Sequence, residues 1–324
     1  MQSPQPADKP GLAASAGLGG NPVSFDEIDD GIYAYIADGC SNTGVVVGDD
    51  SVLVFDAQAT PKMAQAVIDR VRSVTDKPIH HLVLSHYHAV RALGAPAYGA
   101  RQIVCSDEAR DLILERGEQE RANEIARHPH LFRGAETILP DLTWPTTTFS
   151  EDCSIWLGRR EVRLIRLGRG HTTGDIIALI PDCSISFVGD LVEHGAAPYC
   201  GDAHFEDWPA TLDDLSQIGS VAMLPGRGAA LIGPSAVSDA IAATRAFLRD
   251  LYEAVGAKAE GVHSFRETFE HVHATLKPAY GDLADFDRYL PFSVSRAYDE
   301  VGGLDRPRIW TDERDRQMWA QLRG

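Results

Sequence analysis

The sequence has few cysteines, and they do not form closely spaced pairs. Its 324 residues include five cysteines, and no two of these are separated by only two residues. They are Cys40, Cys105, Cys153, Cys183 and Cys200. An odd number of widely spread cysteines favours free thiols in a reducing compartment over a disulfide framework. We therefore expect the protein in the cytoplasm.

Basic residues and long apolar runs are also scarce. The chain has 30 Lys and Arg residues against 47 Asp and Glu residues, which gives a formal net charge of −17. A surface that binds nucleic acid needs the opposite balance, so we expect no nucleic-acid partner. No apolar run approaches the roughly 18–20 residues that cross a bilayer, so we expect no membrane contact.

The first 22 residues lack the features of an export signal. A signal peptide needs a basic region followed by a run of large aliphatic side chains, and this segment has neither. Pro, Gly, Ala and Ser dominate it instead. Such a composition does not form a packed core, and it predicts a disordered tail over residues 1–22.

The composition as a whole is that of a globular protein, with 44% hydrophobic and 24% charged residues. Short β-rich runs alternate with helical patterns over residues 23–234, which predicts an α/β domain. Apolar residues at 237–255 share one helical stripe, and residues 235–324 are predicted to form a helical C-terminal extension. The stripe needs a covering surface, supplied either by the α/β core or by a second copy of the chain in a homo-oligomer.

Three segments share one arrangement, in which an apolar strand ends and a residue that can bind a metal ion follows. His86 and His88 follow the first strand. His171 follows the second strand in a glycine-rich loop, and Asp190 follows the third. Loops at strand ends are where α/β folds place functional groups. Three neutral imidazoles and a carboxylate suit zinc or ferrous iron, with room left for water.

These segments resemble the motifs of the metallo-β-lactamase-fold hydrolases over roughly residues 23–230. That family carries HxHxDH after a strand, then GHT, then GD and then GHG. This chain has HYHAVR at 86–91, GHT at 170–172, GD at 189–190 and GRG at 226–228. The resemblance implies a four-layer αββα sandwich with a metal centre at one edge, between the two sheets. It also implies a first metal bound by His86, His88, His171 and Asp190.

The sequence departs from the family pattern where a second metal ion would bind. In the family, that ion takes the Asp and the last His of HxHxDH, shares the Asp of GD and adds the His of GHG. The three unshared positions here hold Val90, Arg91 and Arg227. Valine has no lone pair to donate, and arginine stays protonated with no acceptor nitrogen. We therefore predict a single divalent metal ion, zinc, with iron as the alternative.

Arg91 and Arg227 have two interpretations. Two guanidinium groups carry the same formal charge as the lost ion, and they can hold a carboxylate, a phosphate or an oxyanion through paired hydrogen bonds. They would then be catalytic residues that contact an anionic small-molecule substrate. Alternatively, they form structural ion pairs with Asp190 or Asp175.

Other residues near the motifs are secondary candidates. Tyr87, placed among the catalytic residues, can donate to an oxyanion or simply pack. Asp175 can orient a ligand imidazole or cap its loop. The loop at 199–204 can line the pocket, and it remains open whether His204 or His194 joins the site. The histidines assigned to surface or packing roles are His80, His81, His128, His130, His263, His271 and His273.

Three functions are compatible with these residues. The first is metal-dependent hydrolysis, in which Asp190 completes the metal shell or orients the water. The resemblance implies an ester, lactone, thioester, amide or phosphoester substrate without choosing among them. The second is a mononuclear iron dioxygenase, similar to the persulfide dioxygenases of this fold, although these keep the full HxHxDH. The third is a non-catalytic binding protein. Retention of all four first-site ligands favours the hydrolase.

Overall fold

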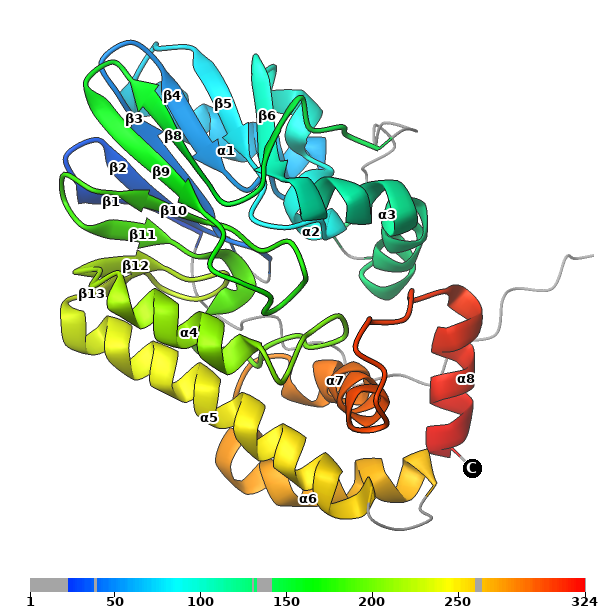
Figure 1. Cartoon of the computed structure of the whole chain (residues 1–324). Helices are drawn as coiled ribbons and strands as arrows, with labels where there is room; N and C mark the ends of the chain where they lie inside the picture. The colour runs from blue at the N-terminus through cyan, green and yellow to red at the C-terminus, as the bar shows by residue number, and fades with distance from the viewer. Residues whose placement is uncertain (1–22, 38–39, 130, 133–141, 260–263, 324) are drawn as a thin grey trace, which may run out of the picture.

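The fold is a sandwich of two β-sheets with helices on both outer faces. The computed structural model describes residues 23–37, 40–129, 131–132, 142–259 and 264–323. The two sheets stack on each other, and α4 and α5 cover one outer face while α1 and α2 lie on the other (Figure 1). The predicted α/β class and the αββα architecture with extra C-terminal helices are therefore confirmed.

The first sheet has seven strands in sequence order. Its first four strands form an antiparallel meander. From the fourth strand onward the pairing is parallel, because a helical connection separates each later strand from the one before it. The strands are β1 (Ser24–Asp29), β2 (Ile32–Ile36), β3 (Thr43–Val47), β4 (Val52–Phe55), β5 (Ile79–Val83), β6 (Gln102–Ser106) and β7 (Thr147–Phe149).

The second sheet has six strands in the order β13-β12-β11-β10-β9-β8. Its pairs are antiparallel except β11 with β12, which are parallel because α4 connects them. The strands are β8 (Asp152–Leu157), β9 (Arg160–Ile165), β10 (Ile177–Ile180), β11 (Ile185–Phe187), β12 (Ala222–Leu224) and β13 (Leu231–Ile232).

The helices begin where local sequence signals place them. Thr60 accepts a hydrogen bond from the Met63 amide as the N-cap of α1, and Pro61 occupies the first turn. The α-helices are α1 (Pro61–Val74), α2 (Ala89–Ala92), α3 (Asp107–Arg127), α4 (Trp208–Gln217), α5 (Pro234–Ala259), α6 (Phe265–Tyr280), α7 (Phe286–Val301) and α8 (Asp312–Arg323). Two short 3-10 helices are η1 (Ala95–Tyr98) and η2 (Gly189–Leu191).

Three apolar clusters hold the layers together. One fills the space between the sheets and includes Leu53 and Leu157. A second lies between the first sheet and its helices, and it includes Val67 of α1. The third joins the second sheet to α4, α5, α6 and α7, and it includes Met223 of β12 and Ile241 of α5. A sandwich built this way presents strand ends and their loops together at one edge, where the candidate site lies.

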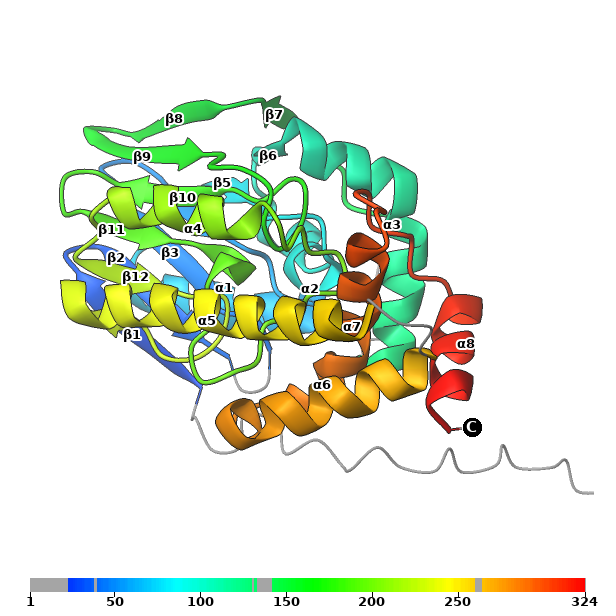
Figure 2. The ribbon, with the colours of Figure 1, turned by 60° about the horizontal axis from the view of Figure 1, so that its bottom comes forward.

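The stripe at 237–255 is covered within the chain itself. Val237, Ile241, Leu248 and Leu251 of α5 are buried in the same cluster as β12 and α4. The division at residue 234 remains a prediction, and α5 packs on the second sheet as part of the sandwich. The last two helices, α7 and α8, gather beside α3 at one end of the sheets in both views (Figures 1 and 2).

Four strands were absent from the sequence-based description. They are β1, β6, β7 and β13, whose patterns are short or mixed: β1 reads SFDEID, β6 reads QIVCS, and β13 has two residues. The expected tail at 1–22 lies outside the described residues. Within the described part of the chain, the structure contains no helix long and apolar enough to cross a membrane.

Candidate metal centre

Four predicted ligands come together at the edge between the sheets. His86 and His88 lie in the loop after β5, and His88 is the N-cap residue of α2. His171 lies in the loop between β9 and β10, and Asp190 lies in η2 directly after β11. Each contributes one atom to a group whose members lie within 4.8 Å of one another, and all four side chains are buried. The structure thus contains a His/Asp cluster that suits a metal ion.

The spacing of the donor atoms fits a small tetrahedral ion. His88 Nδ1 lies 3.1 Å from His86 Nε2 and 3.0 Å from His171 Nε2. Asp190 Oδ2 lies 3.5 Å from His171 Nε2 and 3.8 Å from His86 Nε2. Ligand atoms bound tetrahedrally at about 2.0–2.1 Å from zinc are about 3.3 Å apart. The four atoms need little movement to bind one ion.

Neighbouring groups determine which ring nitrogens carry protons. Ser85 donates its amide and its hydroxyl to Asp56, so the Ser85 oxygen accepts the proton of His86 Nδ1 at 2.9 Å. His88 Nε2 donates to Asp202 Oδ2 at 3.1 Å. Both bonds leave the nitrogen that faces the cluster with a free lone pair, as a metal ligand requires.

Burial keeps two of the imidazoles neutral. It lowers the pKa of His171 to about 3 and the pKa of His86 well below its ordinary value. Burial alone would raise the pKa of Asp202, but the hydrogen bond from His88 and the charge of Arg116 lower that pKa to about 2. Asp202 is therefore an ionised acceptor for His88 across the physiological pH range.

The Arg91 guanidinium is buried beside Asp190 and donates four hydrogen bonds there. Its Nη1 donates to Asp56 Oδ2 and to the Asn42 carbonyl, both at 3.1 Å. Its Nη2 donates to Asp190 Oδ1 and, at 3.0 Å, to the Gly226 carbonyl. A Cβ at Gly226 would lie 2.3 Å from Asp190 Oδ1, so this close approach requires glycine. Arg91 therefore forms an ion pair with Asp190, which was one of the two interpretations of this residue.

Arg227 reaches the same carboxylate from the cavity side. Its Nη1 lies 3.4 Å from Asp190 Oδ2 and donates to Glu193 at 2.6 Å. The guanidinium also lies 5.7 Å from the centre of the Tyr289 ring. Arg227 lines the cavity and Arg91 does not. Of the two arginines, Arg227 is therefore the one placed to contact a bound molecule.

The secondary candidates have defined positions as well. The Tyr87 hydroxyl is buried and donates to Asp202 at 2.9 Å, and its predicted catalytic role stays a prediction. Asp175 accepts from the amide and hydroxyl of Thr172, so it shapes the loop that carries His171. His204 bonds Thr173 and His194 is exposed, and neither belongs to the four-residue cluster.

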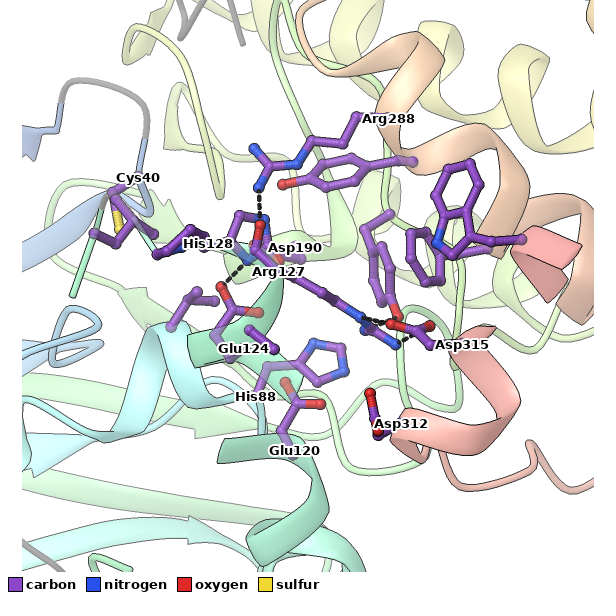
Figure 3. Close-up of a pocket in the computed structure, with 18 of the residues that line it drawn as sticks. Cys40, His88, Glu120, Glu124, Arg127, His128, Asp190, Arg288, Asp312 and Asp315 are labelled. Atoms are coloured by element: carbon purple, nitrogen blue, oxygen red, sulfur yellow. Dashed lines mark hydrogen bonds and ion pairs between the residues drawn. The ribbon is translucent and has the colours of Figure 1, made fainter. Parts of the chain in front are cut away.

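A cavity of about 700 Å³ opens next to the cluster (Figure 3). His88, Asp190 and Arg227 line its inner end. Most other lining residues come from α3, α7 and α8, and sequence reasoning missed them. They are Glu120, Glu124, Ala126, Arg127, Arg288, Tyr289, Phe292, Asp312, Asp315, Arg316, Trp319 and Arg323. The one available signal was the spacing of Glu120, Glu124 and Arg127 along a single face of the predicted helix.

His128 also lines the cavity. The sequence predicts a surface or packing role for it, and its Nδ1 faces the carboxylate of Glu124, four residues earlier. Its position follows from the length of α3, which ends at Arg127 and carries the next residue to the cavity wall. Two other histidines of that group, His130 and His263, lie outside the described residues.

A family model for the metallo-beta-lactamase superfamily matches residues 38–255, about two thirds of the sequence. The chain belongs to this superfamily. The match includes all four residues of the His/Asp cluster, and it ends before α6, α7 and α8. The family resemblance inferred from the motifs is confirmed.

Two curated relatives are distant. The chain is 20% identical over 231 residues to the linear primary-alkylsulfatase of Pseudomonas sp. (strain ATCC 19151), covering 60% of this chain and 43% of that protein. It is 22% identical over 203 residues to the metallo-beta-lactamase type 2 of Bacillus sp. (strain 170), covering 60% of this chain and 70% of that protein. The chain thus spans less than half the length of the alkylsulfatase it matches.

Solved structures support the same fold. A metallo-beta-lactamase from Pontibacter korlensis has a TM-score of 0.55 at 18% identity, covering 70% of this chain and 99% of its own. TMB-1 has a TM-score of 0.52 at 16% identity, covering 70% of this chain and 96% of its own. At these identities the likeness concerns the fold alone.

Proposed function

We propose that the protein is a hydrolase that uses one divalent ion, zinc, bound by His86, His88, His171 and Asp190. The observation that carries this proposal is the convergence of four buried donor atoms, with hydrogen bonds from neighbouring groups orienting the His86 and His88 imidazoles. A bound divalent ion of this kind lowers the pKa of a water molecule and polarises the bond to be cleaved. Hydrolysis then adds hydroxyl to the acyl or phosphoryl group and a proton to the leaving group.

One ion rather than two follows from the surroundings of Asp190. Arg91 bonds Oδ1 of this carboxylate, while Oδ2 faces the histidines. The arginine supplies a permanent positive charge on the side where a second ion would share Asp190. Val90 and Arg227, at the other two positions, offer no lone pair to a metal.

The chain's own groups suit a substrate with negative charge near the reacting bond. Arg227 is buried beside Asp190 and lines the cavity, and both of its hydrogen bonds use the same nitrogen, Nη1. Its second terminal nitrogen, Nη2, has no hydrogen-bond partner in the part of the chain that the structure describes. We infer that Arg227 contacts a carboxylate, a phosphoryl oxygen or a developing oxyanion through this nitrogen.

The cellular location belongs to the same proposal. All five cysteines are free, and Cys40, Cys105 and Cys200 are buried. Burial raises the pKa of Cys105 to about 12, so this thiol is not activated. Buried unreactive thiols support a reducing compartment, and we propose the cytoplasm.

The test combines metal analysis with activity. Protein purified without added metal is analysed by mass spectrometry of its elements and assayed against esters, lactones, thioesters, amides and phosphoesters. We expect about one zinc ion per chain and hydrolysis of at least one class. One iron ion with oxygen uptake would instead support the dioxygenase, and no metal with no turnover would support a binding protein.

Variants of the proposed metal ligands test whether these residues bind the ion. His86→Ala, His88→Ala and His171→Ala should each lose metal and hydrolysis together, because each removes one of four donors that define the geometry. His273→Ala is the control, since His273 is a partly exposed histidine that bonds Asp287 on α7 and does not belong to the cluster. Full metal occupancy in any of the three ligand variants would contradict the assignment.

A further inference from the structure

An aromatic row runs along the cavity wall away from the metal centre. It consists of Tyr199, Tyr289, Phe292 and Trp319, which all line the cavity. The Tyr199 ring lies 5.7 Å from the ring of His88, between ring centres. Phe292 lies 5.8 Å from Tyr199, and Trp319 lies 6.3 Å from Phe292. Tyr289 flanks the row at 5.4 Å from Tyr199. The row is therefore continuous with the cluster.

Two ion pairs lie beside the row. Arg127 donates to both oxygens of Asp315 at 2.8 and 2.9 Å, and its guanidinium lies 4.4 Å from the centre of the Phe292 ring (Figure 3). Arg316 pairs with Asp312 at 2.8 Å. These two pairs neutralise four of the charges beside the row, and the exposed lining of the cavity is more apolar than polar.

Most of the row belongs to the part of the chain beyond the family match. Tyr289 and Phe292 lie on α7 and Trp319 lies on α8, whereas the match ends at residue 255. The Arg127–Asp315 ion pair joins α3 to α8, and so it holds this wall against the sandwich. The C-terminal helices thus give this chain a binding surface that the matched domain does not contain.

We propose that the aromatic row binds an uncharged apolar body of the substrate, next to the bond that is cleaved. The substrate is then an amphiphile, with its polar reacting group near Arg227 and an alkyl chain or ring system along the row. A cavity of about 700 Å³ lies within the range of sites that enclose ligands of this size. The cleavage step rests on the proposed hydrolase function, whereas the binding step is independent of it.

Straight-chain carboxylates test the binding step on the full-length protein as purified. We expect titration calorimetry to give affinities that rise from butanoate to decanoate, by up to about fourfold per buried methylene. Trp319→Ala should weaken decanoate binding roughly tenfold and leave butanoate binding unchanged, because only the longer chain reaches Trp319. Equal affinity for the two carboxylates in the unmodified protein would overturn the proposal.

Control variants test whether decanoate binds to the aromatic row or to apolar side chains elsewhere on the protein. Trp156→Ala removes an exposed tryptophan of β8 that does not line the cavity, and it should bind decanoate as the unmodified protein does. Phe292→Leu keeps a buried apolar side chain and gives a second readout if Trp319→Ala does not fold. Unchanged decanoate binding in both Trp319→Ala and Phe292→Leu would contradict the assigned surface.

Turnover is measured separately, with 4-nitrophenyl esters of the same acids and His86→Ala as the blank. Chain-length-dependent binding without turnover above this blank would overturn the proposed hydrolysis and leave the aromatic row as a ligand site. Turnover without any chain-length dependence, equal in Trp319→Ala, would overturn the row and leave the hydrolase proposal standing.

Discussion

Arg91 is in direct contact with Oδ1 of Asp190, while Oδ2 of the same carboxylate faces His86 and His171. The two side chains are almost completely buried, with exposed fractions of 1% for Arg91 and 3% for Asp190. One carboxylate therefore serves both a protein cation and the donor cluster. The arrangement supports the single-metal centre that we propose.

Removing Arg91 should destabilise the fold. Arg91→Met leaves Asp56 buried without its cation and leaves Asp190 only the longer contact with Arg227, at 3.4 Å. Breaking a buried pair in this way typically costs about 3–5 kcal/mol. We expect a loss of this order in the free energy of unfolding, measured with denaturant. Arg159→Met is the control, because Arg159 pairs with Asp49 at the surface, and it should leave stability unchanged. A stable Arg91→Met protein would mean that the pair is not structural.

Replacing Arg227 should affect activity rather than metal binding. Arg227→Ala removes a charge-assisted contact to the substrate, and the resulting fall in kcat/KM for an anionic substrate should be roughly ten- to a hundredfold. Arg227→Lys should recover only part of this, because the charge returns without the planar pair of donors. Metal content should stay at the level of the unmodified protein. This role of Arg227 is contradicted if a neutral substrate analogue reacts as fast as the anion, or if Arg227→Ala leaves kcat/KM unchanged.

Asp202 should control metal affinity through His88. Asp202→Asn weakens the acceptor of His88 Nε2, and changes of this kind typically reduce metal affinity about 10–100-fold. Tyr87→Phe removes only the hydroxyl that donates to Asp202, so its effect on affinity should be smaller. Competition with a chelator measures both. A larger loss of affinity in Tyr87→Phe than in Asp202→Asn would contradict this order.

The metal cluster could be predicted from the sequence because each ligand directly follows an apolar strand. Strand ends gather at one edge of a sandwich, so the order of the motifs is enough to bring His86, His171 and Asp190 together. The role of Arg91 could not be predicted in the same way. Whether a guanidinium faces a cavity or a buried carboxylate depends on contacts between segments that are far apart, such as Asn42 and Gly226.

The cavity could not be predicted from the sequence, because its wall also depends on contacts between distant segments. Its wall depends on the contact between Arg127 of α3 and Asp315 of α8, which are 188 positions apart. Arg127 shares one helix face with Glu120 and Glu124, but nothing in the sequence indicates that it pairs with Asp315. The same applies to β7, whose three residues carry no alternation and pair with β6 only because the fold brings them together.

Asp175 should make stability depend on pH. Burial raises the pKa of its carboxyl from 3.8 to about 7, so the folded state holds a proton that the unfolded state releases. The free energy of unfolding should therefore fall as pH rises from about 4 to about 7, by up to about 4 kcal/mol from this group. Asp175→Asn should lack this contribution and be more stable than the unmodified protein at pH 8. An unchanged pH profile in the variant would exclude the effect.

The most direct test of the account is the number of metal ions per chain. Protein purified without chelator, and again after incubation with excess zinc and extensive dialysis, is measured by elemental analysis against its amino-acid concentration. Because Val90, Arg91 and Arg227 replace the unshared donors of a second ion, we predict about one tightly bound ion per chain in both samples. Two tightly bound ions per chain would contradict the assignment of these three residues and the single centre built on Asp190.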